Sequence, residues 1–303
     1  KELKNRADKI VGQNVVSAVI GRPVEYVGGN NRQALERMIK ACKIEGFENV
    51  TFEYEPIGAA YDYGVNIKES QKVLVFDFGG GTLDISILKF PEKEVLINVG
   101  LPIGGDHFNS EIFMNKLSKY FGSEATYGLS NLKLPKYIFS SLQNWYEISL
   151  LKSTTFANNI QHFRYKCSDT KSLDRLNSLV TNNLGFNMYE EIERIKKGLT
   201  INDEELYKFH SRDINIETLV KKAEFEEIIE SDLKDIKNLI ENAIKSAKIT
   251  LDEIDIVATT GGSSLVPSVQ RLLVGMFGKN KIKKSDAFTG VASGLAIMAN
   301  NIN

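Results

Sequence analysis

Residues 73–84 read Val-Leu-Val-Phe-Asp-Phe-Gly-Gly-Gly-Thr-Leu-Asp, and this stretch decides the fold. An apolar run is followed by three glycines. After them, apolar and polar residues alternate in residues 83–88, and this pattern predicts two strands joined by a tight turn. Residues 94–99 predict a third strand, so residues 71–101 are expected to form an antiparallel meander. Glycine lets a backbone approach a ligand closely, and successive turn N–H groups bind anions. The turn therefore predicts either a phosphate loop or a plain tight hairpin.

Three polar side chains accompany this turn. Thr82 adds a hydroxyl donor, and Asp77 and Asp84 could hold a metal ion or its waters near a bound phosphate. The spacing is neither that of a P-loop nor that of the dinucleotide-binding G-x-G-x-x-G motif. Considered alone, these residues leave the two interpretations of the turn equally open.

Residues 1–64 predict the order helix, strand, helix, strand, helix. Residues 15–20 are apolar on both faces, which is typical of a buried parallel strand. Asn30 or Asn31 can cap the next helix. The apolar residues of that helix recur at three- and four-residue steps, which predicts one buried face.

The remainder of the chain is less uniform. Residues 122–190 are the least legible, with modest helical patterning near 137–151 and 172–181. Residues 222–247 carry the clearest helical stripe. A strand at 255–259, a helix from Leu265 to Phe277 and a last helix from Asp286 to about Ala299 are expected after it.

The two ends of the chain repeat one plan. Residues 15–64 and 255–299 share the order strand, helix, strand, helix, and each final helix carries small residues, at 58–60 and 290–294. Small residues permit close helix approach. A meander precedes the second copy and none precedes the first, so we expect an N-terminal truncation or a segment before residue 1. Coincidental βα patterning is the alternative.

The composition excludes several classes of protein. The chain has 303 residues, 42% hydrophobic and 25% charged, with a formal net charge of -1, which is ordinary for a globular protein. A nearly neutral balance predicts neither nucleic acid nor an anionic membrane as a partner. Cys42 and Cys167 suggest no disulfide framework. No apolar run approaches the about 18 residues of a membrane span. The expected compartment is the cytoplasm.

Five segments, in order along the chain, together resemble the ATP-binding domain of the Hsp70 chaperone family, within the actin-like ATPase superfamily. They are residues 55–64, 73–88, 103–109, 193–200 and 261–267. The resemblance omits residues 122–190. With Gly21-Arg22-Pro23-Val24 and Asn31-Arg32-Gln33, it is closest to short bacterial Hsp70 homologues that lack a peptide-binding domain.

The resemblance implies an α/β, two-lobed actin-like ATPase fold with ribonuclease-H-like sheets and an incomplete first lobe. Residues 1–69 would form the partial lobe I, residues 70–103 and 241–303 the core of lobe II, and residues 104–240 an inserted subdomain.

The resemblance also implies ATP or ADP in a cleft between the lobes, with Mg²⁺ and often K⁺. It gives catalytic roles to Glu55, Asp77 and Thr82, with Asp77 and Asp84 binding the metal through water. The implied nucleotide contacts are Gly79, Gly80, Gly81, Thr82, Gly104, Gly105, Glu193, Lys196, Thr200, Gly261, Gly262, Ser263, Ser264 and Asp286. The spacing of Glu193, Lys196 and Thr200 places them on one helix face, for which a solvated charged face is the alternative.

Several positions depart from the family pattern. Leu265 stands where the family has an arginine that stacks on adenine, and His107 and Asn109 replace acidic residues. No D-x-G-[TS] phosphate loop and no catalytic lysine lie upstream. The chain alone is therefore expected to be a poor ATPase.

For the complete protein, the expectation is ATP hydrolysis coupled to lobe closure and chaperone-type activity, with client and co-chaperone proteins as partners. One alternative is a truncated or degenerate nucleotide-binding or protein-interaction module without turnover. Another is a sugar or acetate kinase of the same superfamily, which the match at residues 193–200 disfavours.

Overall fold

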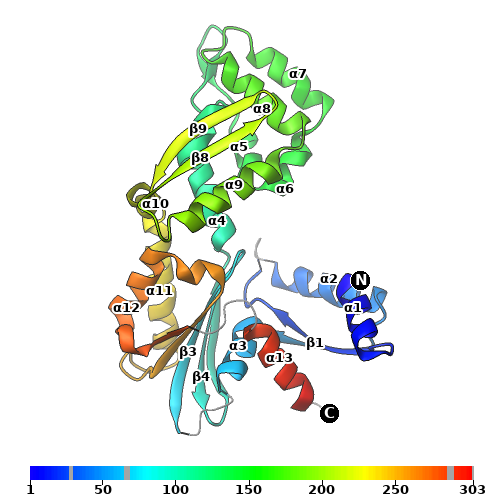
Figure 1. Cartoon of the computed structure of the whole chain (residues 1–303), viewed down its shortest axis with the longest axis vertical. Coiled ribbons are helices and arrows are strands. Elements are labelled where there is room, and N and C mark those ends of the chain that lie inside the picture. The colour runs from blue at the N-terminus through cyan, green and yellow to red at the C-terminus, as the bar shows by residue number, and fades with distance from the viewer. Residues whose placement is uncertain (27–29, 65–68, 285–289, 302–303) are drawn as a thin grey trace. The chain divides into compact units, whose positions relative to one another are not determined.

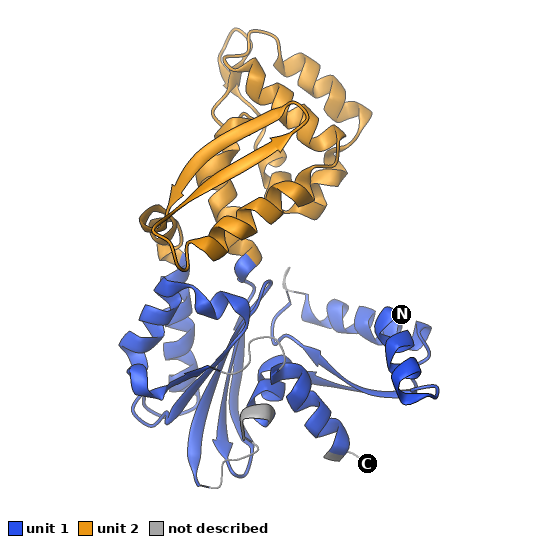
Figure 2. Cartoon of the chain, in the orientation of Figure 1, with its two compact units in different colours: residues 1–105, 232–303 blue, residues 106–231 orange. Residues whose placement is uncertain are grey.

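The computed structural model of the chain describes residues 1–26, 30–64, 69–284 and 290–301. Two compact units divide the chain (Figure 2): unit 1 is residues 1–105 with 232–303, and unit 2 is residues 106–231. The division of the chain into a partial first lobe, a second-lobe core and an insertion at 104–240 stays a prediction. Within the described residues, no helix has both the length and the apolar character that a membrane crossing requires.

A five-stranded mixed sheet forms the core of unit 1 (Figure 1). Its strands are β3 (Gln71–Phe78), β4 (Leu83–Phe90), β5 (Glu94–Leu101), β10 (Ile256–Thr260) and β11 (Ile282–Lys284). The order across the sheet is β11-β10-β3-β4-β5. β3, β4 and β5 are antiparallel neighbours, as the meander predicted, while β10 runs parallel to β3 and to β11.

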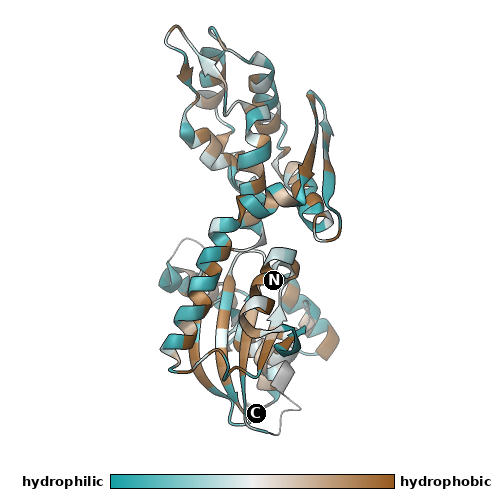
Figure 3. Cartoon of the chain, turned by 90° about the vertical axis from the view of Figure 1, so that its left-hand side faces the viewer, coloured by the Kyte–Doolittle hydropathy of each residue, from teal (hydrophilic) through white to brown (hydrophobic). Residues whose placement is uncertain are grey.

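Helices cover both faces of this sheet because its strands are apolar on both sides (Figure 3). The helices of unit 1 are α1 (Glu2–Val11), α2 (Asn31–Ile44), α3 (Glu55–Gly64), α12 (Pro267–Phe277) and α13 (Gly290–Asn301), and α11 (Glu230–Ser246) lies largely in it. Ala59 and Ala60 of α3 pack on Val73 and Val75 of the sheet. Figure 1 places α11 and α12 on the other side.

The two small-residue helices, α3 and α13, lie against each other. A Cβ on Gly58 of α3 would lie 3.0 Å from the carbonyl oxygen of Val291 in α13 and 3.1 Å from Leu295. Only glycine lets the two helix backbones come this close. α3 thus bridges the sheet and the last described helix.

Two predictions about burial near the N-terminus are wrong. β1 (Ser17–Arg22) does pair in parallel with β2 (Asn49–Tyr54), but none of its residues is buried. α2 has the predicted apolar stripe and is capped by Asn30, yet none of its residues is buried either. An apolar stripe shows which face of a helix is suited to burial. It does not show that any of the described residues packs against that face.

Unit 2 is mostly helical and carries one long hairpin. Its elements are α4 (Gly105–Ile112), β6 (Thr126–Tyr127), β7 (Leu132–Lys133), α5 (Lys136–Leu142), α6 (Trp145–Ile148), α7 (Thr154–Phe163), α8 (Thr170–Thr181), α9 (Gly185–Gly198), β8 (Glu204–Ser211), β9 (Ile214–Lys221) and α10 (Lys222–Ile228). Large apolar side chains fill its core, namely Phe113, Phe121, Leu142, Leu173, Leu176, Leu179, Met188, Ile192 and Tyr207.

Three predicted helices differ in their bounds. The helix expected at 222–247 is divided at Ile229 into α10 and α11. Residues 262–265 form a short 3-10 turn, so the helix expected to start at Leu265 begins at Pro267, because proline fits a first helical position. α13 is described from Gly290, and the start predicted at Asp286 lies outside the described residues.

Candidate functional site

The turn between β3 and β4 is held by its own strands. Phe78 pairs with Leu83 and Asp77 with Asp84, so the chain reverses over residues 79–82. The Gly79 amide donates to the Thr82 carbonyl at 3.0 Å, which closes the turn. Gly80 and Gly81 are exposed, which leaves their backbone open to a ligand.

Sheet register brings two other glycine segments to this turn. Thr260 of β10 pairs with Asp77, so Gly261 and Gly262 follow β10 beside Phe78. Leu101 of β5 pairs with Leu83, so Gly104 and Gly105 follow β5 on the other side. The structure thus unites residues 79–81, 104–105 and 261–262, which we name the glycine cluster.

The Gly79 carbonyl oxygen ties the glycine cluster together. It accepts hydrogen bonds from the Gly105 amide at 3.0 Å and from the Ser263 hydroxyl at 2.7 Å. The Ser264 hydroxyl donates to the Gly261 carbonyl at 2.7 Å, which holds the third segment in its bend. These bonds fix the backbone shape of the cluster before any ligand arrives.

Two glycines of the cluster are required by close packing. A Cβ on Gly104 would lie 2.3 Å from the Gly80 carbonyl oxygen, and a Cβ on Gly261 would lie 2.3 Å from the Phe78 carbonyl oxygen. Gly261 also has φ +80, a conformation that other residues rarely adopt. Gly262 differs, because no atom lies within 4 Å of the position of its Cβ. It faces open space.

Three carboxylates lie beside the glycine cluster and disfavour one another's charge. Burial, and then the charges of Glu55 and Asp84, together raise the pKa of Asp77 to about 7. Burial, and then the charge of Asp84, raise the pKa of Glu55. Burial also raises the pKa of Asp84, opposed by hydrogen bonds from the Thr82 hydroxyl and from the amides of Val24 and Glu25.

Asp84 connects the turn to the N-terminal part of unit 1. Its carboxylate accepts from the Thr82 hydroxyl at 2.9 Å and from the Val24 amide at 2.8 Å. A Cβ on Gly100 would lie 2.7 Å from the same carboxylate, so glycine is needed there. The sequence did not predict these partners of Asp84. The one signal was Gly100, a glycine at the end of an apolar strand run, which indicates that another group approaches the backbone closely there.

The carboxylates suit a hydrated cation. A nearby positive charge would favour the ionised carboxylates, against the burial and the neighbouring negative charges that raise their pKa values. Within the part of the chain that the structure describes, no three His, Cys, Asp or Glu side chains are grouped closely enough to ligate one ion directly. Asp77 and Asp84 would therefore act on the ion's waters, which Mg²⁺ usually keeps.

Unit 2 contains a second group of predicted residues. Lys196 of α9, only 8% exposed, lies 2.6 Å from a carboxylate oxygen of Glu193, and the Asn109 side-chain amide donates to the same oxygen at 2.9 Å. Burial lowers the pKa of Lys196, partly offset by the charges of Glu193 and Asp106. Burial alone would raise the pKa of Glu193, but Lys196 and Asn109 outweigh it and the pKa is lowered.

Comparison with known proteins identifies the family. A sequence profile described as Hsp70 protein matches residues 1–137 and 155–302. The chain belongs to the Hsp70 family. Its fold is accordingly that of an actin-like ATPase with an incomplete lobe. The profile covers more of residues 122–190 than the sequence resemblance had indicated, since it leaves only residues 138–154 unmatched within that region.

Curated Hsp70 relatives match nearly the whole chain. Chaperone protein DnaK of Prochlorococcus marinus is 29% identical over 98% of this chain and 40% of its own length. The protein of the same name from Guillardia theta is 29% identical over 99% of this chain and 40% of its own length. The Mycoplasmopsis agalactiae protein of that name is 28% identical over 98% of this chain and 42% of its own length. This chain thus spans about two fifths of the relatives it matches.

Some residues taken from the Hsp70 resemblance lie apart from these groups. Thr200 is not on the helix face with Glu193 and Lys196, because α9 ends at Gly198 and Thr200 lies in the following turn. Its hydroxyl donates to the Lys197 carbonyl at 2.7 Å. Asp286 lies outside the described residues.

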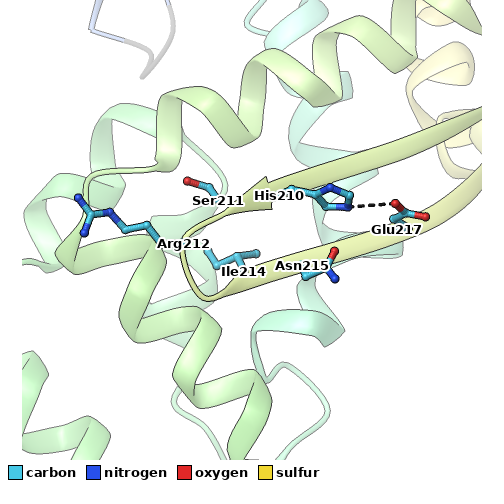
Figure 4. A pocket seen from close by; sticks show the side chains of 6 residues that line it. All are labelled: His210, Ser211, Arg212, Ile214, Asn215 and Glu217. Carbon is cyan, nitrogen blue, oxygen red and sulfur yellow. Dashed lines mark ion pairs between the residues drawn. The ribbon is translucent and has the colours of Figure 1, made fainter.

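The concave surface at the end of the β8–β9 hairpin holds none of the residues predicted from the Hsp70 resemblance (Figure 4). His210, Ser211, Arg212, Ile214, Asn215 and Glu217 line it. His210 and Glu217 form a 3.0 Å cross-strand ion pair, and both are about half exposed. Such exposed pairs contribute little to stability. The glycine cluster is therefore the better candidate site.

Proposed function

We propose that unit 1 of this Hsp70-family chain binds the phosphates of an adenosine nucleotide at the glycine cluster. The observation that carries the proposal is the convergence of three glycine segments on the Gly79 carbonyl, beside the buried carboxylates of Asp77 and Asp84 and the half-buried carboxylate of Glu55. Exposed turn amides favour anions, and neighbouring carboxylates favour the cation that accompanies a phosphate chain. One site thereby offers both kinds of contact.

The proposal gives each of the candidate site residues in unit 1 a role. The amides of residues 80–82 hold phosphate oxygens, while the Gly79 amide closes the turn. The Thr82 hydroxyl exchanges its hydrogen bond to Asp84 for one to a phosphate oxygen. Mg²⁺, when bound, neutralises phosphate charge, and K⁺ is a further candidate ion. Asp77 and Asp84 hold the waters of the cation, and Glu55 orients a water for attack. Positioning and charge neutralisation supply most of the rate in phosphoryl transfer.

In unit 2, we propose that Glu193 and Lys196 bind the hydroxyls of a ribose. Asn109 is 4% exposed, and its side-chain carbonyl oxygen has no hydrogen-bond partner among the described residues. A buried acceptor of this kind is normally satisfied by water or by a ligand. A ribose hydroxyl is a suitable donor.

For the whole protein, we propose hydrolysis of ATP coupled to lobe closure, in the service of chaperone activity on client proteins together with co-chaperones. The curated relatives are described as chaperone proteins, and this supports the same assignment here.

Nucleotide binding without turnover is the second candidate. Within the described ranges, no lysine or arginine forms an ion pair with Glu55, Asp77 or Asp84. Transition-state charge on a phosphoryl group is usually stabilised by such a cation. A phosphate-release assay on the full-length protein separates the candidates, because nucleotide binding without release favours the second.

Calorimetric titration with ADP and Mg²⁺ tests the proposed site. We expect the unmodified chain to bind and the Gly262→Trp variant to lose at least about tenfold in affinity, or about 1.4 kcal/mol, because the indole would fill the open space beside the glycine cluster. Gly275→Trp is the matched control, since Gly275 in α12 also faces open space. Its affinity should be unchanged.

Two results would contradict this proposal. If the unmodified chain does not bind ADP, nucleotide binding by these residues alone is wrong. If both tryptophan variants bind equally well, nucleotide lies elsewhere.

A further inference from the structure

Three aromatic side chains form an exposed group where α6 meets α9. Trp145 and Tyr146 begin α6 and Phe186 lies in the first turn of α9, and they are 48%, 53% and 51% exposed. The Trp145 ring centroid lies 5.5 Å from that of Phe186 with planes at 78°, and 5.9 Å from that of Tyr146 with planes at 85°. Neither pair is stacked flat, so each contact covers at most one face of one ring, and about half of each side chain stays exposed. We name these three residues the aromatic patch.

The aromatic patch stands on a rigid support. A Cβ on Gly185 would lie 2.8 Å from Ile148, so α6 packs tightly on the start of α9. Ile148 is buried, and the Tyr189 hydroxyl donates to the Leu142 carbonyl at 2.8 Å beneath the patch. A surface that is ordered before binding loses little entropy when a partner arrives.

The charged residues of α6 and of the first two turns of α9 are acidic. α6 carries Glu147, and the first two turns of α9 carry Glu190 and Glu191, with no lysine or arginine among them. Glu191 is paired with Arg194, whereas Glu147 and Glu190 form no ion pair within the described ranges. Burial and the charges of Glu147 and Asp106 raise the pKa of Tyr146, so negative charge reaches the patch itself.

We propose that the aromatic patch is a docking site for an arginine side chain on an exposed segment of another protein. A guanidinium group stacks flat on an open aromatic face while its N–H groups reach carboxylates, a combination that a lysine reproduces less well. Glu147 and Glu190 supply the carboxylates. Leu150, 78% exposed and one turn after Tyr146, offers an apolar contact for a residue beside the arginine.

Two residues of the patch lie outside the segments that the Hsp70 profile matches. Trp145 and Tyr146 lie in residues 138–154, the internal stretch that the Hsp70 profile does not match. Tryptophan, tyrosine and arginine are the residue types that most often dominate binding energy at protein interfaces. The patch therefore adds a protein-binding surface that nucleotide binding does not require.

A titration with a defined peptide tests the docking site. Trp145 is the single tryptophan of the chain, so its fluorescence reports directly on the patch. The probe is a blocked Gly-Ser peptide carrying Arg-Leu pairs, compared with the same peptide carrying citrulline in place of arginine. We expect the arginine peptide to change Trp145 emission in a saturable way and the citrulline peptide to bind at least about fivefold more weakly.

Variants of the chain separate ring contacts from charge. With a fluorescently labelled peptide, Phe186→Leu and the double variant Glu147→Gln/Glu190→Gln should each weaken binding about fivefold. Tyr165→Leu is the control, because Tyr165 is equally exposed but lies away from α6 and α9, in the loop after α7. Equal affinity for the two peptides, or unchanged affinity in both patch variants, would overturn the proposal. Unchanged circular dichroism of each variant ensures that a loss of binding reports on the patch.

Discussion

Replacing Asp77 with asparagine is expected to stabilise the nucleotide-free chain at pH 8 by about 2–4 kcal/mol. The folded-state pKa of Asp77 is raised to about 7 by burial and by Glu55 and Asp84, from a usual value of 3.8. Between about pH 4 and pH 7, the folded state therefore holds a proton that the unfolded state has lost. The stability that this proton contributes is lost as the pH rises through 7. Asparagine removes this dependence because it carries no charge.

Urea unfolding of both proteins at pH 4 and pH 8, without Mg²⁺ or nucleotide, measures this effect. The two proteins should be nearly equal at pH 4 and should differ at pH 8. Asp235→Asn is the control, because Asp235 is exposed on α11 and its substitution should change stability by no more than about 0.5 kcal/mol. Equal stability of the Asp77→Asn variant and the unmodified chain at pH 8 would show that ionised Asp77 is not destabilising.

The second large effect is expected from two adjacent glycines. Gly261→Ala should destabilise the chain by about 2–4 kcal/mol and abolish nucleotide binding, because φ +80 strains an alanine and its Cβ would lie 2.3 Å from the Phe78 carbonyl oxygen. Gly262→Ala should cost no more than about 0.5 kcal/mol, since its Cβ would meet open space. Both variants replace glycine with alanine, so a difference in stability between them reports on the position alone.

Thermal unfolding and ADP titration of the two alanine variants give the comparison. Similar unfolding temperatures for both would mean that the bend at Gly261 relaxes without cost, contrary to its contacts. Normal ADP binding by a correctly folded Gly261→Ala variant would show that the glycine cluster is not the phosphate site.

Local patterns predicted the elements of unit 1 well. The alternation in residues 83–88 and the apolar run before it predicted the meander, because strand period is a property of a few neighbouring residues. The small residues at 58–60 and 290–294 indicated that each helix can approach a neighbour closely, and the contacts at Gly58 show that the two helices approach each other. The Asn30 cap was also predicted, because a cap depends on residues three positions apart.

Features that depend on contacts between residues far apart in the sequence could not be predicted from local patterns. Burial of β1 and α2 was expected from their apolar residues, yet burial depends on what covers them. The hairpin of β8 and β9 was missed although Tyr207 and Phe209 alternate with polar residues, because Arg212-Asp213 lacks the glycine typical of tight hairpin turns.

The candidate site was predicted in parts from the family resemblance, but its assembly was not. Nothing in the local sequence shows that Ser263 bonds to Gly79, since 184 positions separate them. Asn109 could be identified only as a departure from the family pattern, and its bond to Glu193 required the structure.

The two hydrogen bonds that the Gly79 carbonyl oxygen accepts also have a consequence for folding during synthesis. Their two donors come from Gly105 and Ser263, so the glycine cluster cannot be completed until residues far beyond unit 2 have left the ribosome. Contacts of such long sequence separation form slowly and late. A nascent chain halted before Ser263 would carry a folded unit 2 and a β3–β4 hairpin, but an unfinished glycine cluster. We expect the proposed nucleotide affinity to arise only after β10 and the residues that follow it have joined the sheet.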